Sequence, residues 1–422
     1  MIRLIEALNY RCLRYVRQPL EPFHVLVGLN ASGKTTFLDV VAFLGTLVSE
    51  GLKQAVTERT QNLRDLVWGR EGTCFELAIE AAIPDDRKAS LNKPWDAIRY
   101  EVRIGLDSQT GEVSILEEKA ILKAWQENGS VQRDLYPMYP MEPLPPDTII
   151  TTKARKGDWT VLSKAPGGND NFYPEVEGGA GKGWFPSIRL GPRKSALANL
   201  PEDETRFPVS TWLKRMLIDG VQKFVFNSLL IRKASPPGQG KGMSVDGANL
   251  PWVIAELEKP KNSQQFVWWI DHLRTALPDL ETIRTVERSD DKHRYLVLRY
   301  RGGLEVPSWM ASDGTLRLLA LTIPAYLPDF RGIALIEEPE NGIHPSAVET
   351  VFNSLSSVYN AQVLLATHSP VILSVADVKN VLCFKKTESG ATDIVRGDEH
   401  PALRHWKGEV NLSVLFAGGV LG

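Results

Sequence analysis

Residues 25–36 read V-L-V-G-L-N-A-S-G-K-T-T. From Gly28 to Thr35 this sequence fits the phosphate-binding pattern G-x-x-x-x-G-K-[ST]. The apolar run at residues 23–27 predicts a buried strand before the loop, and residues 37–44 predict a helix after it. A strand, a glycine-containing loop and a helix N-terminus in this order predict a cradle for phosphate groups.

The residues of this loop have distinct predicted roles. Backbone N–H groups of residues 30–35 can converge on a phosphate, assisted by the positive end of the helix dipole. Gly33 leaves room for close approach, Lys34 can reach the β- and γ-phosphates, and the Thr35 hydroxyl can ligate Mg²⁺. The predicted nucleotide-binding residues are Asn30, Ala31, Ser32, Gly33, Lys34, Thr35 and Thr36.

The composition bounds the class of protein. The chain has 422 residues, enough for two or three domains, and 49 Lys and Arg nearly balance 51 Asp and Glu. The small net charge therefore gives no overall electrostatic attraction to nucleic acid or membrane, although these counts allow a local basic face. Cys12, Cys74 and Cys383 lack disulfide or metal-ligand spacing, and no apolar run suits a signal peptide or membrane span. We expect a cytoplasmic protein without a membrane partner.

The hydrophobic pattern predicts an α/β fold with an antiparallel addition. Three short strands over residues 2–27 are followed by alternating apolar and polar residues at 75–83, 98–104 and 113–125, which indicate an antiparallel β flap. Residues 209–226 read as a helix. The proline-rich residues 136–146 indicate a connector or, alternatively, a polyproline segment that docks a partner.

Two further segments carry polar residues that can act on a phosphate. The loop at residues 311–315 contains Ser312, Asp313 and Gly314 and opens an apolar helix, which makes it a second anion site or an ordinary helix cap. The apolar strand at residues 332–336 ends in Glu337 and Glu338. Carboxylates at the carboxyl end of a strand lie where ligands bind in open α/β sheets, and burial there favours a general base.

A third apolar strand, residues 362–366, leads into His368. A histidine at a strand end can be a satisfied polar group with no further role. Because it follows a phosphate-binding loop and an acidic strand end, we interpret His368 as a sensor of the γ-phosphate.

In this order, the four segments resemble an ABC-type P-loop ATPase of the RecF/OLD-like branch, over residues 1 to about 375. Residues 28–35 are similar to the Walker A motif, 311–315 to the ABC signature and 333–338 to Walker B. The resemblance places Glu338 at the catalytic glutamate and His368 at the switch histidine. It implies an N-terminal half of an ATPase head with the β flap (residues 1–135), a helical and mixed insertion (136–300) and a C-terminal half (301–422).

The chain departs from the family pattern at three points. Thr35 and Glu337 are the implied metal-site residues, but Glu337 stands where many ABC proteins have aspartate, which implies Mg²⁺ held through water or less tightly. The signature begins Ala-Ser rather than Leu-Ser. The glutamine of the family's Q-loop has three candidates, Gln61, Gln126 and Gln132.

The mechanism that the resemblance implies is a head-to-tail dimer, or a higher homo-oligomer of the same chain, that uses ATP and Mg²⁺. ATP on Walker A of one subunit is covered by Ser312, Asp313 and Gly314 of the other. Glu338 polarises the attacking water, while Lys34 and His368 offset charge on the γ-phosphate.

The biological role implied is that of a stand-alone ATPase subunit. OLD-family nucleases carry a Toprim domain after the ATPase, which needs about 100 residues, whereas 52 residues follow Pro370 here. Their apolar end, residues 412–422, is either a capping element of the core or a docking segment. We expect the subunit to control a separate effector, a nuclease or toxin, in anti-phage defence. The alternatives are a RecF-like DNA-repair ATPase that binds DNA and an ATP-gated scaffold with little turnover.

Overall fold

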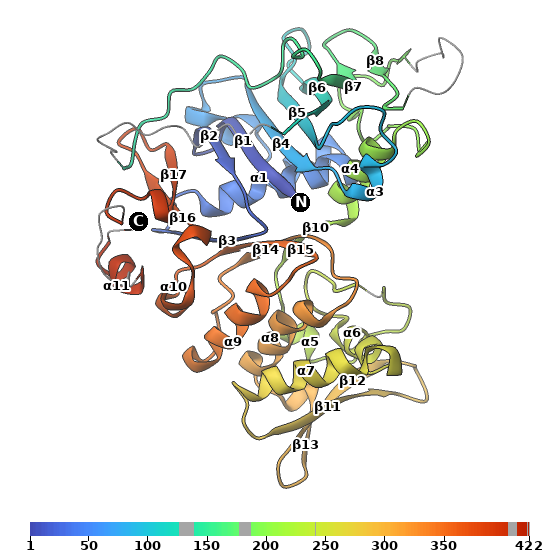
Figure 1. The fold of residues 1–422 in the computed structure, drawn as a ribbon, viewed down its shortest axis with the longest axis vertical. Helices are drawn as coiled ribbons and strands as arrows, with labels where there is room; N and C mark the ends of the chain where they lie inside the picture. Colours follow the sequence, from blue (N-terminus) through green and yellow to red (C-terminus); the bar gives the residue numbers. More distant parts are fainter. Residues whose placement is uncertain (126–138, 177–186, 241, 404–411, 420, 422) are drawn as a thin grey trace.

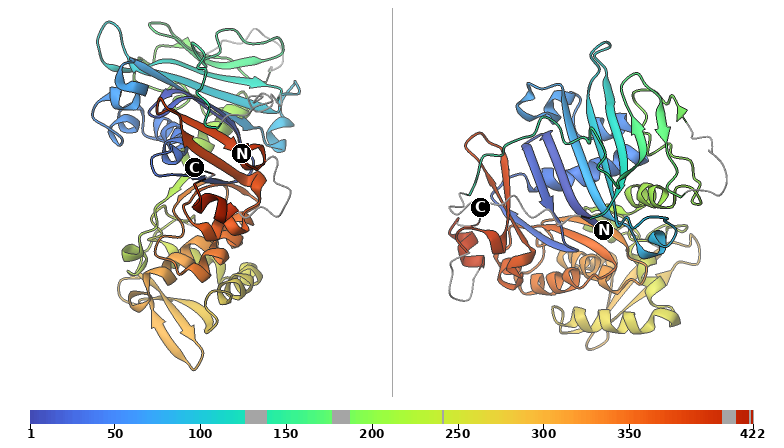
Figure 2. Two further views of the ribbon diagram at one scale, coloured as in Figure 1. Left: turned by 90° about the vertical axis from the view of Figure 1, so that its left-hand side faces the viewer. Right: turned by 45° about the horizontal axis from the view of Figure 1, so that its top comes forward.

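The computed structural model describes residues 1–125, 139–176, 187–240, 242–403, 412–419 and 421. Two large sheets and a group of helices form successive layers, and a small three-stranded sheet lies at the far end (Figures 1 and 2). Within the described residues, no helix combines the length and the apolar character needed to cross a membrane.

The six-stranded sheet positions the predicted chemistry. Its strand order is β10 (Val221–Phe224), β14 (Gly332–Glu337), β15 (Ala361–Ala366), β3 (Phe23–Gly28), β16 (Val381–Lys386) and β17 (Thr392–Arg396). Adjacent strands pair in parallel except β17, which is antiparallel to β16. The carboxyl ends of β14, β15 and β3 therefore meet at one edge of the sheet, where α/β folds bind ligands.

The eight-stranded sheet is antiparallel and corresponds to the predicted flap. Its order is β2 (Leu13–Pro19), β1 (Ile2–Tyr10), β4 (Cys74–Ala82), β5 (Ala97–Leu106), β6 (Val113–Lys123), β7 (Trp159–Lys164), β8 (Asp170–Phe172) and β9 (Ser187–Ile188). Helix α1 (Lys34–Ser49) lies between the two sheets, and its Phe37 and Phe43 are fully buried there. This helix is apolar on several faces because it is covered on both sides.

Most of the remaining helices cover the other face of the six-stranded sheet. These are α5 (Ser228–Ile231), α6 (Leu250–Leu257), α7 (Ser263–Arg274), α8 (Asp313–Thr322), α9 (Pro345–Ser356) and α10 (Pro370–Val375). The three-stranded sheet β11 (Leu280–Glu287), β12 (Arg294–Tyr300) and β13 (Leu304–Pro307) packs beside α6 and α7. Helix α11 (Leu412–Ala417) packs against α10, so that the apolar tail caps the core in this structure.

The residues predicted as an insertion, 136–300, are distributed over three places. Strands β7–β9 extend the eight-stranded sheet, and β10 forms one edge of the six-stranded sheet. Helices α5–α7 with β11 and β12 form the helical part. The predicted helix over 209–226 is wrong beyond Asp219: α4 (Pro208–Asp219) ends there, and the carbonyl of Gly220 accepts a 2.7 Å hydrogen bond from the N–H of Ile333 in β14.

The connector interpretation of the proline-rich segment fits its described part, residues 139–146. The N–H of Met141 donates to Asp393 at 2.7 Å, and the carboxylate of Glu142 accepts from the Ser389 N–H at 2.9 Å and from its hydroxyl at 2.8 Å. The segment thus binds to the β16–β17 hairpin of the same chain. Residues 136–138 lie outside the described part.

Candidate functional site

The phosphate-binding loop joins the end of β3 to the start of α1. Gly28 and Gly33 both adopt positive φ, +152° and +107°. A Cβ at Gly28 would lie 2.3 Å from the Phe384 carbonyl oxygen, and one at Gly33 would lie 2.3 Å from Thr392 Oγ1. That Thr392 hydroxyl donates to the carbonyl of Ser32 at 2.9 Å. The hairpin β16–β17 therefore packs closely against Gly28 and Gly33, where a larger residue does not fit.

We expect Gly33→Ala to weaken ATP binding by about tenfold or more. An alanine at φ +107° is strained by roughly 1–3 kcal/mol, and its Cβ would also displace Thr392. Calorimetric titration with ATP measures the affinity. Gly51→Ala is the matched control, because Gly51 has φ +94° and a Cβ added there would meet nothing within 4 Å. ATP affinity equal to that of the unmodified chain in Gly33→Ala would contradict a role of this loop in binding.

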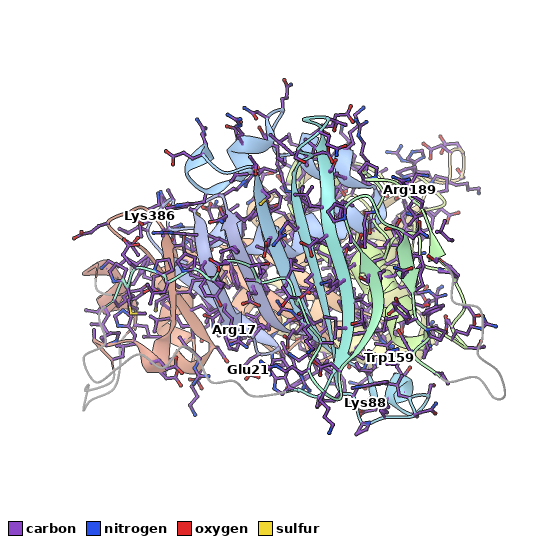
Figure 3. The ribbon with its side chains drawn as sticks, turned by 90° about the horizontal axis from the view of Figure 1, so that it is seen from above. Arg17, Glu21, Lys88, Trp159, Arg189 and Lys386 are labelled. Atoms are coloured by element: carbon purple, nitrogen blue, oxygen red, sulfur yellow. The ribbon has the colours of Figure 1, made fainter. Side chains whose placement is uncertain are left out.

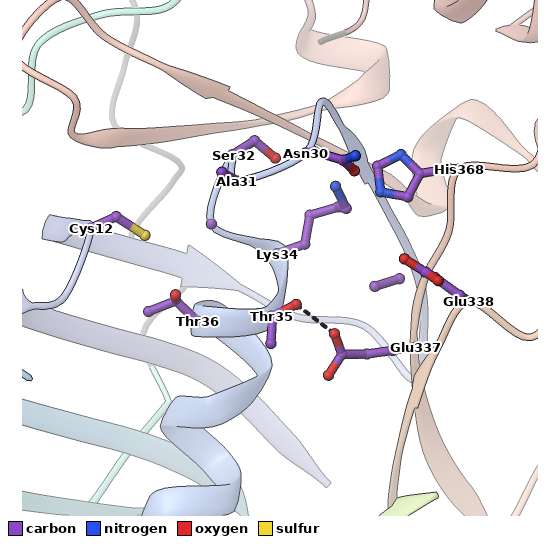
Figure 4. Close-up of a pocket in the computed structure, with 12 residues that line it drawn as sticks. Cys12, Asn30, Ala31, Ser32, Lys34, Thr35, Thr36, Glu337, Glu338 and His368 are labelled. Atoms are coloured by element: carbon purple, nitrogen blue, oxygen red, sulfur yellow. Dashed lines mark hydrogen bonds between the residues drawn. The ribbon is translucent and has the colours of Figure 1, made fainter. Parts of the chain in front are cut away.

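One cavity of about 280 Å³ brings together the loop, the acidic strand end and the histidine (Figure 4). The residues that line it come from the β1–β2 turn, the loop, the first turn of α1 and the ends of β14 and β15 with the residues that follow them: Cys12, Asn30, Ala31, Ser32, Gly33, Lys34, Thr35, Thr36, Glu337, Glu338, Ala366 and His368. All seven residues predicted to bind nucleotide line this cavity. Cys12 has no sequence motif to mark it and was not predicted.

Lys34 points into the cavity toward His368 and Glu338 (Figure 4). Its Nζ donates to the carbonyls of Gly28 at 2.8 Å and Leu29 at 3.0 Å. Burial lowers the pKa of Lys34 to about 8, and the carboxylates of Glu338 and Glu337 oppose that shift. A phosphate in the cavity would stabilise the charged ammonium further.

Thr35 and Glu337 form the candidate metal site. The Thr35 hydroxyl donates to Glu337 Oε2 at 2.5 Å (Figure 4), and Glu337 Oε1 forms an ion pair with Lys223 Nζ at 2.8 Å. Two oxygen ligands side by side, one a carboxylate, suit Mg²⁺, which takes its other ligands from phosphates and water. Glu337 therefore contacts the threonine directly in this chain.

Glu338 has an unusual backbone conformation at the end of β14. Its φ is +48°, in the left-handed region that non-glycine residues rarely adopt. The Glu338 N–H donates to the carbonyl of Ala366 in β15 at 2.7 Å, and its carboxylate accepts a hydrogen bond from the Asn341 amide. Arg317 in turn donates to the Asn341 carbonyl at 2.6 Å. The Glu338 side chain is exposed, so the expectation that burial favours a general base is wrong for this residue. Contacts to β15 and to the following turn hold its carboxylate at the cavity.

His368 follows β15 and is positioned by Glu340. Glu340 Oε1 accepts from the His368 N–H at 2.8 Å and from the Thr367 hydroxyl at 2.7 Å. Burial, followed by the nearby Lys34 charge, lowers the pKa of His368, while Glu338 and Glu340 oppose the shift. The imidazole is therefore mostly neutral at pH 7 and can donate or accept a hydrogen bond.

The signature residues lie outside the cavity, at the start of α8. The Ser312 hydroxyl accepts from the Thr315 N–H at 3.1 Å and caps the helix, and Asp313 pairs with Arg232 at 2.7 Å. A Cβ at Gly314 would lie 2.7 Å from the Gly342 carbonyl. Neither Ser312, Asp313 nor Gly314 lines the cavity formed by the loop of the same chain.

Several residues at the site were not predicted as site residues. Lys223 and Thr392 act through partners that are distant in the chain. Glu340 and Asn341 lie within and directly after the acidic run at residues 337–340, a position that could have indicated a role. The Q-loop glutamine is not located. Gln61 is exposed and does not line the cavity, and Gln126 and Gln132 lie outside the described residues.

Comparisons with known proteins bear on the fold of this chain. Residues 215–374 match the family model described as "AAA domain, putative AbiEii toxin, Type IV TA system". The structure is similar to an Smc head bound to the C-terminal winged-helix domain of ScpA, with a TM-score of 0.53 and 14% identity over 93% of this chain and 97% of that chain. It is also similar to the Pyrococcus furiosus Smc head bound to the C-terminal domain of ScpA, with a TM-score of 0.51 and 13% identity over 93% and 95% of the two chains. The fold is that of an ABC-type P-loop ATPase head, as the sequence predicted.

Proposed function

We propose that the chain hydrolyses ATP between two copies arranged head to tail and thereby controls a separate effector protein. Its fold is that of an ABC-type P-loop ATPase head, and its residues 215–374 match an AAA-domain model. The observation that carries the ATPase proposal is one cavity lined by Lys34, Thr35, Glu337, Glu338 and His368. These residues come from three strand ends far apart in the sequence. Their convergence supplies a phosphate cradle, a metal site and a candidate base.

The residues that line the cavity have different proposed roles in ATP hydrolysis. Thr35 and Glu337 would hold Mg²⁺, which when bound neutralises phosphate charge. The carboxylate of Glu338 faces the cavity, where it can orient water and accept its proton. Lys34 binds the β- and γ-phosphates, and the imidazole of His368 contacts the γ-phosphate. Each of these residues already forms a hydrogen bond or an ion pair with another residue of the chain.

The second copy is proposed because the signature residues do not line the cavity of their own chain. Ser312 is exposed at the N-terminus of α8, a ten-residue helix whose dipole favours an anion there. The neighbouring Trp309 and Met310 are 49% and 70% exposed. An apolar surface beside a potential phosphate site supports a covering partner at this face.

Mixing two inactive variants tests whether the signature acts across the dimer. Ser312→Asp keeps a helix-capping side chain but adds a negative charge that repels the γ-phosphate. Lys34→Ala retains a normal signature. In a heterodimer, the loop of the Ser312→Asp subunit faces the intact signature of its Lys34→Ala partner. We therefore expect each variant alone to be inactive and partial ATP turnover, measured as phosphate release, to return on mixing.

The choice of Ser312 follows from the structure, because a side chain at Gly314 would push against Gly342 of the same chain. Ser312→Asn, which caps the helix without a charge, is the matched control and should keep most activity. Differential tags establish that heterodimers form. Absence of any recovery in confirmed heterodimers would reject shared catalysis in this form.

Control of an effector, a nuclease or toxin in anti-phage defence, is the second part of the proposal. The family model that matches residues 215–374 refers to a toxin of a toxin–antitoxin system. The similar Smc heads were solved with a domain of ScpA bound, so that heads of this fold can bind a separate protein. Co-expression of the tagged chain with its untagged genomic neighbours tests this proposal. We expect one neighbour to co-purify, and failure of every neighbour to do so would count against it.

The alternative of a RecF-like DNA-binding role has less support than the proposed effector control. The relevant surface is the face of the eight-stranded sheet that points away from α1. That face is rich in charged side chains (Figure 3), but its central cations are paired. Arg99 contacts Glu6, Glu80 and Glu101 at 2.6–3.2 Å, and Lys123 contacts Glu80 at 2.9 Å. DNA affinity that falls steeply with salt would favour this alternative. ATP-dependent assembly without turnover would favour the scaffold.

A further inference from the structure

Both carboxylate oxygens of Glu337 are already occupied within the chain. Oε2 accepts the Thr35 hydroxyl at 2.5 Å, and Oε1 pairs with the Lys223 ammonium at 2.8 Å. The side chains of Lys223 and Glu337 are 39% and 25% exposed, so the pair is only partly screened by water. A cation thus lies beside the residue that would hold Mg²⁺.

The sheet topology fixes this arrangement. Strand β10 pairs in parallel with β14, and Lys223 is the Cα partner of Leu335. Glu337 lies two residues beyond Leu335, so its side chain points to the same face of the sheet as that of Leu335. Because β10 is the edge strand, Lys223 approaches Glu337 from the side opposite β15.

The ammonium also has space into which it can withdraw. Lys223 lines a second cavity of about 390 Å³ that shares Glu337 and Glu338 with the nucleotide cavity. Arg317 and Asn341 lie on its wall. The ammonium can therefore leave Glu337 without unfolding β10.

We propose that Lys223 is a tethered counter-cation that competes with Mg²⁺ for Glu337 and so sets the metal dependence of nucleotide binding. The inference rests on the proposed ATPase function. Without metal, Lys223 neutralises Glu337 and reduces its repulsion of the nucleotide phosphates. With metal, the same ammonium repels the divalent cation. Lys223 therefore strengthens metal-free binding and weakens the gain from Mg²⁺.

The test compares the affinity for a fluorescent ATP analogue, measured by anisotropy, in EDTA and in saturating Mg²⁺. The dissociation constant in EDTA divided by that in Mg²⁺ reports the coupling between metal and nucleotide. In Lys223→Met this ratio should rise about tenfold, a usual size for coupling between two bound ligands. Affinity in EDTA should fall, and the Mg²⁺ concentration for half-maximal effect should decrease. Lys223→Arg, which keeps the charge, should stay close to the unmodified chain.

The outcomes separate this inference from the proposed function. Failure of the unmodified chain to bind the analogue under either condition would overturn the ATPase proposal itself. Normal binding with an unchanged ratio in Lys223→Met would overturn the competition. A lower ratio in Lys223→Met would also overturn the competition. It would instead indicate that Lys223 positions Glu337. Lys223→Gln serves as a second neutral variant if thermal unfolding shows that Lys223→Met is misfolded.

Discussion

Replacing Glu338 by glutamine is expected to lower ATP turnover by about two to four decades, because the amide cannot accept a proton from the attacking water. The substitution keeps the shape of the side chain, and the hydrogen bond with Asn341 can be retained through the amide oxygen. Nucleotide binding should survive, because Glu338 is not part of the phosphate-binding loop. Phosphate release under saturating ATP and Mg²⁺ measures the effect.

Glu337→Gln is the matched control for this experiment. It changes the adjacent carboxylate, which contacts Thr35 and Lys223 rather than Asn341. We expect it to raise the Mg²⁺ concentration that turnover requires. If Glu337→Gln accumulated bound ATP while Glu338→Gln hydrolysed it normally, the two roles would be reversed.

Lys34→Ala is expected to weaken ATP binding by about 100-fold or more, because removal of one partner from a partly buried ion pair costs several kcal/mol. Lys34 also donates to two carbonyls of its own loop, so the loss acts on the cradle as well as on the phosphates. Isothermal calorimetry measures the affinity.

Lys53→Ala, in the short exposed part of α2 (Leu52–Thr57), controls for the loss of a surface lysine. It should bind ATP like the unmodified chain. Thermal unfolding of both variants separates lost binding from lost folding. Unchanged affinity in folded Lys34→Ala would refute the assignment of the loop.

The sequence predicted those parts of the site that have local patterns. Gly28 and Gly33 are required by backbone conformation, and the apolar strands that end in Glu337 and in His368 are short runs with a clear boundary. Because β3, β14 and β15 are parallel neighbours, their ends meet at one edge once the sheet forms. Local signals and one topological rule were therefore sufficient for this part of the site.

Lys223 could not be predicted in the same way. Val221 and Phe224–Phe226 follow a helix in the sequence, and their apolar character fits continuation of that helix. The chain turns into a strand because Gly220 and β10 pair with β14, more than 100 residues later. Such pairing between distant segments overrides local propensity.

Pairing with distant segments also explains why residues 136–300 are distributed over both large sheets and the helical part. Strand β7 joins the flap by pairing with β6, β8 pairs with β7, and β9 pairs with β8; the composition of these strands does not indicate this pairing. Glu340 likewise acquires its role only when β15 delivers Thr367 and His368 to it.

Sedimentation velocity of Glu338→Gln with and without ATP and Mg²⁺ tests whether ATP joins two copies through the signature. This variant should bind ATP and not release it, so the joined state accumulates. We predict a shift from monomer to dimer that requires ATP and disappears when Ser312→Asp is added to the same chain. An unchanged sedimentation coefficient at ATP concentrations that calorimetry shows to be saturating would contradict the account.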